Sequence, residues 1–341
     1  PFKLQSWEQG RQLVFVRNEN FWDQPKPYLD SVVVALIPSP QQQVNALIRG
    51  EVDWAVIPFS QVQRAREAAK DGKIDVRRIP FSSPARLSMD FNLRQPPFDN
   101  VKVRQAFFMA TDRKQIAADA YHGLAIPETN VIPGQFSELT DPSVDYSKTF
   151  PFDLQAAGKL LDEAGYPLKD GKRFAIELTS GNAGSALGTV YNDAANIIAA
   201  RWRQVGIEVR LSNLDQAIWL QKVYEKHDFH VSITSLTATF DPTFGIDRSY
   251  LCNTTTLAYK NPTGYCNQEF EEVAAKANAA KWSDRRQFYK RYAEIVARDL
   301  SEVTLTNVGQ THGMATRFGN YEAQYEVAFD GYPSWAEVWL K

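Results

Sequence analysis

Short β-rich runs alternate with helical stretches along nearly the whole chain, and this alternation limits the possible folds more than any other feature of the sequence. In the first quarter of the chain, strands are expected at 12–16, 31–37, 51–57 and 74–79, and helices at 44–48 and 61–70. Gly50 follows the first of these helices and is expected to cap it. Strands that alternate with helices form an α/β lobe, so we predict the α/β fold class.

The alternation returns after residue 86 and predicts a second α/β lobe. Extended segments are expected at 86–93, 174–178, 206–211, 229–236, 303–308 and 314–317, and helices at 101–111, 113–121, 153–164, 189–205, 216–224, 270–280 and 284–299. Residues 126–151 are rich in Pro, Ser, Thr and Asp. We expect a long ordered loop or lid there, because Val131, Ile132, Phe136 and Tyr146 remain available to pack.

The length and composition of the chain further limit its possible fold and partners. The chain has 341 residues, more than one hydrophobic core usually serves, so at least two cores are expected. Hydrophobic residues make up 44% and charged residues 23%, which is typical of a folded protein. The formal net charge is −2 and the basic residues are scattered, which argues against nucleic acid as a partner. Because no apolar run reaches the roughly 20 residues of a membrane-spanning helix, we expect none in the chain.

The chain has two cysteines, Cys252 and Cys266, in a segment rich in Asn, Thr, Gly and Pro. That composition is typical of a loop. A disulfide between them would staple the loop and would indicate an oxidising compartment. Two free thiols remain the alternative.

Motifs for catalysis or metal binding are not apparent in the sequence. His122, His227, His230 and His312 do not have the spacing of a metal-binding motif. Residues 180–188 precede a predicted helix but match neither the dinucleotide-binding, the P-loop nor the nucleophile-elbow pattern. The helical carboxylates lie among lysines and arginines, as on solvated faces. We therefore expect no catalytic residue, no metal and no cofactor.

Two polar residues follow the strand predicted at 229–236 and are candidates for ligand contact. Asp241 lies where α/β folds usually place ligands, but an Asp before a Pro is also an ordinary turn residue. Arg248 is suited to bind a ligand carboxylate with two parallel hydrogen bonds, or to pair with a neighbouring acid. The backbone N–H groups of residues 180–188 are suited to receive a ligand oxygen, or they form a plain turn.

Several sequence strings resemble the bacterial extracellular solute-binding proteins of family 5, the peptide and nickel group. The strings are FNL at 91–93, PPFDNVKVRQAF at 96–107, DLQAAGKLLDEAGY at 153–166, WRQVGIEV at 202–209 and PTGYCN at 262–267. The opening PFKL and the string NFW at 20–22 extend the resemblance over essentially the whole chain.

The resemblance implies a class II periplasmic-binding-protein fold, with two lobes of mixed sheets flanked by helices, the first lobe being incomplete. Residues 1–86 are then part of the large lobe (domain I), residues 87–305 form the second lobe (domain III), and residues 306–341 return to the large lobe. Because family members normally carry a further N-terminal region, the chain resembles a C-terminal fragment. A disulfide between Cys252 and Cys266 is also implied, as in some dipeptide-binding relatives.

The implied function is that of the substrate-binding component of an ABC importer, which closes two lobes around a peptide-like or other small solute. A permease in the membrane is the implied partner, with a periplasmic or other extracytoplasmic location, and we expect a monomer. The alternatives are a sensory or scaffold module on the same fold and a hydrolase, for which no converging set of catalytic groups is apparent.

The resemblance also implies a ligand site, from which this sequence departs. Similar dipeptide binders hold the ligand amine with an Asp and the carboxylate with an Arg, at places where this chain has Ala238 and Ser185. A free dipeptide held at both ends is therefore disfavoured, because burying an unpaired charge is costly. The residues expected to contact the solute are Asn92, Ser185, Trp219, Ser235, Thr237, Thr239, Phe240, Asp241 and Arg248.

Overall fold

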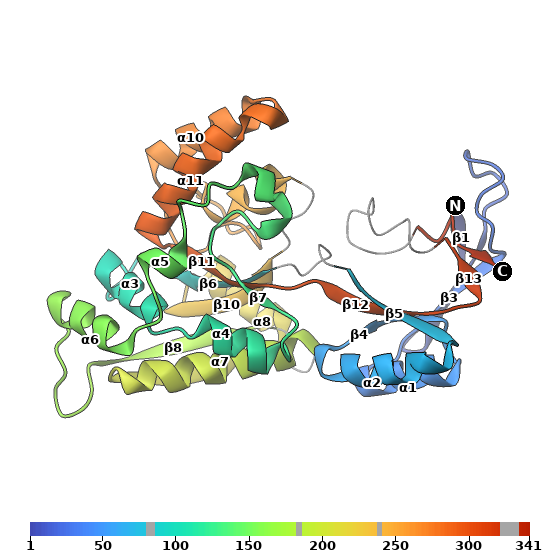
Figure 1. Ribbon diagram of the computed structural model, residues 1–341, viewed down its shortest axis with the longest axis horizontal. Helices are drawn as coiled ribbons and strands as arrows, with labels where there is room; N and C mark the ends of the chain where they lie inside the picture. The colour runs from blue at the N-terminus through green and yellow to red at the C-terminus, as the bar shows by residue number, and fades with distance from the viewer. Residues whose placement is uncertain (80–85, 182–185, 237–240, 321–333) are drawn as a thin grey trace. The chain divides into compact units, whose positions relative to one another are not determined.

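The computed structural model describes residues 1–79, 86–181, 186–236, 241–320 and 334–341 (Figure 1). The chain forms two compact units. Unit 1 comprises Pro1–Ser83 and Gly309–Lys341, and unit 2 comprises Pro84–Val308. The sequence predicts domain boundaries after residues 86 and 305. The identification of the units as the large and second lobes of a solute-binding protein stays a prediction.

Unit 1 is built on antiparallel sheets. The strand orders are β1-β2-β3 (Phe2–Glu8, Gln12–Arg17, Ser31–Ala35), β4-β12-β5 (Trp54–Ile57, Gln310–Ala315, Ile74–Ile79) and β13-β14 (Phe318–Gly319, Trp339–Leu340). In the second of these sheets the central strand, β12, comes from the end of the chain. Two distant parts of the sequence therefore complete one sheet.

Helix α1 (Pro40–Arg49) covers the β4-β12-β5 sheet together with α2 (Val62–Ala68). The Ser39 hydroxyl accepts a hydrogen bond from the Gln42 N–H, and Gly50 ends the helix with φ of 74°. This confirms the expected glycine cap. The buried side chain of Leu47 lies so close to Gly313 of β12 that any side chain at 313 would overlap it.

Unit 2 is built around one mixed sheet of six strands, ordered β7-β11-β6-β10-β8-β9. The strands are β6 (Arg86–Phe91), β7 (Ile126–Pro127), β8 (Phe174–Ser180), β9 (Ile207–Asn213), β10 (Val231–Leu236) and β11 (Glu302–Asn307). The neighbours β10, β8 and β9 are parallel, whereas β6 is antiparallel to both β10 and β11. Such a sheet needs helical crossovers between its parallel strands, as the sequence alternation predicted.

The helices and helical turns of unit 2 are α3 (Val101–Met109), α4 (Arg113–Gln115), η3 (Ile116–Ala120), η4 (Gly134–Leu139), α5 (Tyr146–Thr149), α6 (Leu154–Glu163), α7 (Ala186–Gln204), α8 (Gln216–Leu220), η5 (Gln221–Glu225), α9 (Pro242–Gly245), η6 (Asp247–Ser249), α10 (Gln268–Ala279), η7 (Trp282–Asp284) and α11 (Arg286–Asp299). Helix α7 runs along β8, and α10 lies beside α11 (Figure 1). None of the helices within the described ranges is both long and apolar enough to cross a membrane.

The two faces of the unit 2 sheet differ in chemistry because side chains alternate along a strand. On β6, Leu87, Met89 and Phe91 share one face and are fully buried. That face packs against an aromatic cluster in which Phe91 lies 5.3 Å from Phe98 and Phe107 lies 4.5 Å from Trp202, measured between ring centroids. The opposite face is polar and equally buried.

The segment expected to be a long ordered loop, residues 126–151, is ordered by the four side chains that the sequence indicated. Val131, Ile132, Phe136 and Tyr146 are all buried. The segment also contains the short strand β7, which pairs with β11, and the helical turns η4 and α5. The loop is thus part of the core of unit 2.

Cys252 and Cys266 form a disulfide with an S–S distance of 1.98 Å, which confirms the expected pairing. The loop that the disulfide closes is also tied internally. The Asn261 side-chain amide donates to the carbonyls of Leu251 and Tyr265, at 2.9 and 2.8 Å. The loop therefore has a defined shape beside the site described next.

Candidate functional site

The carboxyl ends of the parallel strands β8, β9 and β10 meet at one edge of the unit 2 sheet. Ser180 ends β8 and Leu236 ends β10, and β6 runs the other way, so its first residue, Arg86, pairs with Leu236 at the same edge. Ligands of α/β proteins usually bind where parallel strands end. The residues gathered around this edge are called the strand-end site below: Gly181, Gln216, Ser235, Asp241 and Arg248.

Gly181 directly follows β8 and allows α8 to approach the sheet. A Cβ at this position would lie 2.8 Å from the ring of Trp219 and 3.0 Å from Gln216 Oε1. Trp219 is almost fully buried against Val223, Tyr224 and Phe229, and its Nε1 donates to Ser232 Oγ at 3.0 Å. The absence of a side chain at 181 therefore sets how closely α8 packs on the strand end.

Gln216 presents a hydrogen-bond acceptor at this edge. Its Nε2 donates to the Tyr259 hydroxyl at 2.6 Å, which fixes the amide, and its Oε1 is buried and accepts no hydrogen bond from any described residue. A buried acceptor without a donor is costly, so such groups call for a partner. An N–H group of a bound solute would satisfy it.

Ser235 lies near the carboxyl end of β10 and is half-buried. Its backbone N–H donates to the Tyr191 hydroxyl at 3.1 Å, and its side chain hydrogen-bonds with Tyr121. Burial raises the pKa of Tyr121, so this phenol stays neutral. Ser235 therefore takes part in a neutral hydroxyl network.

The segment that carries Asp241 and Arg248 is anchored to the sheet edge by Arg86. The Arg86 Nη2 donates to the Gly245 carbonyl at 3.3 Å and to Ser249 Oγ at 3.2 Å. The Arg86 side chain is completely buried. The segment therefore lies directly over the first residue of β6.

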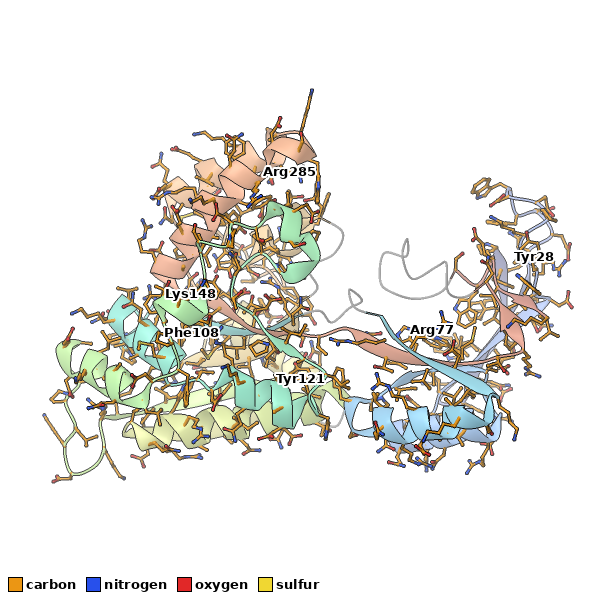
Figure 2. The ribbon with its side chains drawn as sticks, viewed as in Figure 1. Tyr28, Arg77, Phe108, Tyr121, Lys148 and Arg285 are labelled. Atoms are coloured by element: carbon orange, nitrogen blue, oxygen red, sulfur yellow. A yellow bond between two sulfur atoms is a disulfide. The ribbon has the colours of Figure 1, made fainter. Side chains whose placement is uncertain are left out.

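Asp241 caps α9 and is also paired with an arginine. Its Oδ1 accepts from the Thr243 N–H at 2.9 Å, and its Oδ2 lies 2.7 Å from Nη1 of Arg285, which directly precedes α11 and is labelled in Figure 2. Burial opposes ionisation of this carboxyl, but the bonds from Thr243 and Arg285 hold its pKa below the usual value. Asp241 is therefore an ionised group with a structural role in the segment.

Arg248 is half-buried between the loop of the disulfide and the polar face of the sheet. Its carbonyl accepts from the Asn261 N–H at 2.7 Å. Burial lowers the pKa of the guanidinium, and the charge of Arg86 lowers it further, while Glu302 opposes the shift. A guanidinium in such surroundings is charged and suited to a carboxylate.

Asn92 and Trp219 have their side chains engaged by the protein itself. Asn92 follows β6 at the opposite edge of the sheet, where its amide donates to the carbonyls of His227 and Phe229, each at 2.9 Å. The structure does not bring Asn92 to the strand-end site. Trp219 lies next to the site but contributes buried area to the core of unit 2.

Four residues expected to contact the solute, Ser185, Thr237, Thr239 and Phe240, lie outside the described residues. Gln216, Tyr259 and Arg285 were not expected from the sequence. Gln216 could have been found from the sequence, because it begins a predicted helix after a strand. Tyr259 and Arg285 could not, because their partners depend on tertiary contacts. Across the described ranges, no three His, Cys, Asp or Glu side chains are grouped closely enough to hold a metal ion.

Comparison with known protein families gives a match over most of the chain. The family described as bacterial extracellular solute-binding proteins, family 5 Middle, matches residues 1–256. The glutathione-binding protein GsiB of Salmonella typhimurium is 31% identical over 63% of this chain and 39% of its own length. The heme-binding protein A of Haemophilus influenzae is 25% identical over 97% of this chain and 59% of its own length. The chain thus spans about two fifths to three fifths of these relatives.

Solved structures show the same fold. The periplasmic binding protein AgaA from A. tumefaciens R10, in complex with agropinic acid, has a TM-score of 0.83 at 21% identity. The periplasmic binding protein DppA from Helicobacter pylori, in complex with the peptide STSA, has a TM-score of 0.81 at 22% identity. Each match covers 100% of this chain, with 67% of AgaA and 62% of DppA. The α/β, periplasmic-binding-protein-like fold expected from the sequence is confirmed.

Proposed function

The chain belongs to the bacterial extracellular solute-binding proteins of family 5, and from this membership we propose that it acts as the solute-binding component of an ABC import system. The proposal includes a membrane permease as partner, a periplasmic or other extracytoplasmic location and a monomeric state. The family is one of binding proteins, so the solute is held and released unchanged.

The strand-end site is the observation that carries the proposal. Its groups are suited to binding: a buried amide oxygen on Gln216, a half-buried guanidinium on Arg248 and the hydroxyl network of Ser235. Ionised Asp241 is already engaged by Arg285 and Thr243. These groups recognise donors and anions by hydrogen bonding, which is the way small-molecule sites achieve specificity.

The solute that suits this site is a small molecule with an N–H donor and a carboxylate, of the peptide-like class. Gln216 Oε1 would accept from the donor and Arg248 would bind the carboxylate. Glutathione-binding and dipeptide-binding relatives, named for solutes that carry both groups, support this class.

We further propose that the two units close on the solute by hinge motion. The chain passes from unit 1 to unit 2 once and returns once, near residues 83/84 and 308/309. Two crossings of this kind are the usual hinges of two-lobed binding proteins. The proposed hinges therefore lie where the chain crosses between the units.

Thermal-shift measurements with a panel of dipeptides, longer peptides, glutathione, opines, sugars and metal chelates test the function. A solute that binds only the folded state raises the melting temperature by mass action. Arg248→Ala should abolish the shift that a carboxylate solute produces, whereas Arg291→Ala, which alters an exposed arginine on α11, should leave it unchanged. Turnover of any panel member, or no shift with the whole panel, would contradict the proposal.

A further inference from the structure

The polar face of the unit 2 sheet encloses three charged side chains. Arg86 and Asp90 lie on the same face of β6, and Glu302 lies on β11. Each has at most 1% of its surface exposed. Asp90 and Glu302 are direct cross-strand partners. Two carboxyl groups and one guanidinium are therefore buried together, with more acids than bases.

The hydrogen bonding around the two acids is incomplete if both are ionised. Their carboxyl groups are within hydrogen-bonding reach of each other. None of their four oxygens accepts a hydrogen bond from an N–H or O–H group of the described residues. Arg86 Nη1 lies 3.1 Å from Glu302 Oε1, which is ion-pair distance, although the two are not aligned as a hydrogen bond. One proton would turn the repulsion of two carboxylates into a hydrogen bond.

We infer that Asp90 is protonated at neutral pH and donates a hydrogen bond to Glu302, whose single negative charge balances Arg86. Arg86, held in place by Glu302, is then the positioning residue for the segment 241–249. The proton is assigned to Asp90 rather than to Glu302, because it is an oxygen of Glu302 that lies at ion-pair distance from the Arg86 guanidinium. The charges of the cluster then balance, as burial requires.

Other titratable groups face the cluster. Burial raises the pKa of Asp90, the charge of Glu302 raises it further, and Arg86 only partly opposes them. Arg248 and Glu128 also interact with Arg86, and burial raises the pKa of Glu128. Four tyrosines also face the cluster, and they add no charge because burial raises their pKa: Tyr146, Tyr224, Tyr250 and Tyr292.

Arg86 connects this cluster to the strand-end site. One nitrogen, Nη1, faces Glu302 and donates to Thr304 Oγ1 at 3.2 Å, while Nη2 donates to Gly245 and Ser249. The bonded groups lie on both sides of Arg248. The importance of this link for solute binding rests on the proposed function, but its existence can be tested without any solute.

Infrared difference spectroscopy of the 341-residue chain at pH 7.5 tests the position of the proton. A protonated carboxylic acid has a C=O stretch that is separate from the carboxylate bands. Asp90→Asn should remove one such band, whereas Asp299→Asn, which alters an acid whose pKa is lowered, should remove none. Loss of the band in Glu302→Gln with retention in Asp90→Asn would overturn the assignment, as would the absence of the band from the unaltered chain.

Hydrogen exchange tests the positioning role. The amides of Ile246, Ser249 and Tyr250 donate within the segment and report on its order. In Arg86→Met and Arg86→Lys, which lose the fork to Gly245 and Ser249, these amides should exchange at least roughly tenfold faster, the effect of losing hydrogen bonds to a charged group. Glu302→Gln should act in the same direction, and Asp90→Asn should leave the exchange nearly unchanged.

Arg104→Met is the matched control for the loss of a buried arginine. Arg104 donates to the carbonyls of Phe98 and Asp299, away from the segment, so its loss should not accelerate the three amides selectively. If Arg86→Met does not fold, Arg86→Lys provides the measurement. Unchanged exchange in both Arg86 variants, or fast exchange in Asp90→Asn, would overturn the inference.

Discussion

At the scale of single residues, two aspartates in the segment after β10 show how surroundings set charge. Asp241 caps α9 and pairs with Arg285, and its pKa lies below the usual value. Asp247, six residues later, is 1% exposed, and its Oδ2 accepts from Asn278 Nδ2 at 3.0 Å. Burial raises the pKa of Asp247 from 3.8 to about 6, against the effect of hydrogen bonds from Asn278 and Tyr292. Asp241 is therefore held ionised, whereas burial favours the neutral form of Asp247.

This raised pKa predicts a pH-dependent loss of stability. Because the pKa of Asp247 is higher in the folded chain, its contribution is complete below about pH 4 and is lost as the pH rises through about 6. The loss by pH 7.5 amounts to at most about 3 kcal/mol. Asp247→Asn should remove this dependence and raise the free energy of unfolding at pH 7.5, as measured by urea denaturation at pH 4.5 and 7.5.

Asp284→Asn, at an exposed position, is the control and should keep the pH dependence of the unaltered chain. Equal pH dependence in the Asp247 variant and the unaltered chain would contradict the prediction.

At the scale of elements, the packing of α8 on the end of β8 depends on one small residue. Gly181 leaves room for the Trp219 ring, and an added methyl group would lie 2.8 Å from it. Gly158, inside α6, has only Arg173 Nη2 near its Cβ position, at 3.5 Å. Close packing therefore requires a glycine at 181, whereas the position of Gly158 has room for a methyl group.

Alanine substitutions at these two glycines should have opposite effects. Gly181→Ala should lower the free energy of unfolding by about 1–3 kcal/mol, because the core must shift to admit the methyl group. Gly158→Ala should raise it by up to about 1 kcal/mol, because alanine favours a helix interior. Chemical denaturation monitored by circular dichroism measures both. A Gly181→Ala chain as stable as the parent would show that Trp219 has room to move.

Much of the element order was predictable from the sequence because hydrophobic periodicity is a local signal. The strand expected at 74–79 agrees with β5, and the cap at Gly50 agrees with the end of α1, although α1 begins at Pro40, four residues before the predicted start. The helices expected at 113–121 and 216–224 exist, but each continues past its α-helical turns as a π-helical segment, η3 and η5. The strand β1 was not predicted, because its side chains are mostly exposed and lack a clear apolar alternation.

The candidate site was predictable only in position. That ligands meet the ends of parallel strands is a general rule, and it led to Asp241 and Arg248, whereas Ser235 followed from the family resemblance. The partners were not predictable, because Arg285 meets Asp241 across 44 residues and Arg86 meets Gly245 across 159. The buried pair of Asp90 and Glu302 depends in the same way on a cross-strand register that no local pattern encodes.

At the scale of the whole molecule, the two units differ in how the chain supplies them. Unit 2 is a single continuous stretch, Pro84–Val308, whereas unit 1 combines Pro1–Ser83 with Gly309–Lys341. In unit 1, β12 lies between β4 and β5 and pairs with both. Unit 1 therefore depends on the last part of the chain for the middle of a sheet.

Deletion of residues 309–341 should separate the stabilities of the two units. Without β12, β4 and β5 have no partner in their sheet, and unit 1 should unfold while unit 2 keeps its amide spectrum in nuclear magnetic resonance. Deletion of residues 1–8 removes the edge strand β1 and should leave the β4-β12-β5 sheet intact. Loss of both units on deleting 309–341 would contradict their independence.

The late position of β12 also has a consequence for biosynthesis. As the ribosome extends the chain, all six strands of unit 2 are available once residue 307 has emerged, but β4 and β5 wait for a neighbour that is made afterwards. Until then their backbone edges are open to wrong partners. The nascent polypeptide can therefore complete the β4-β12-β5 sheet only after unit 2 has been synthesised, and in that interval a chaperone would need to shield β4 and β5.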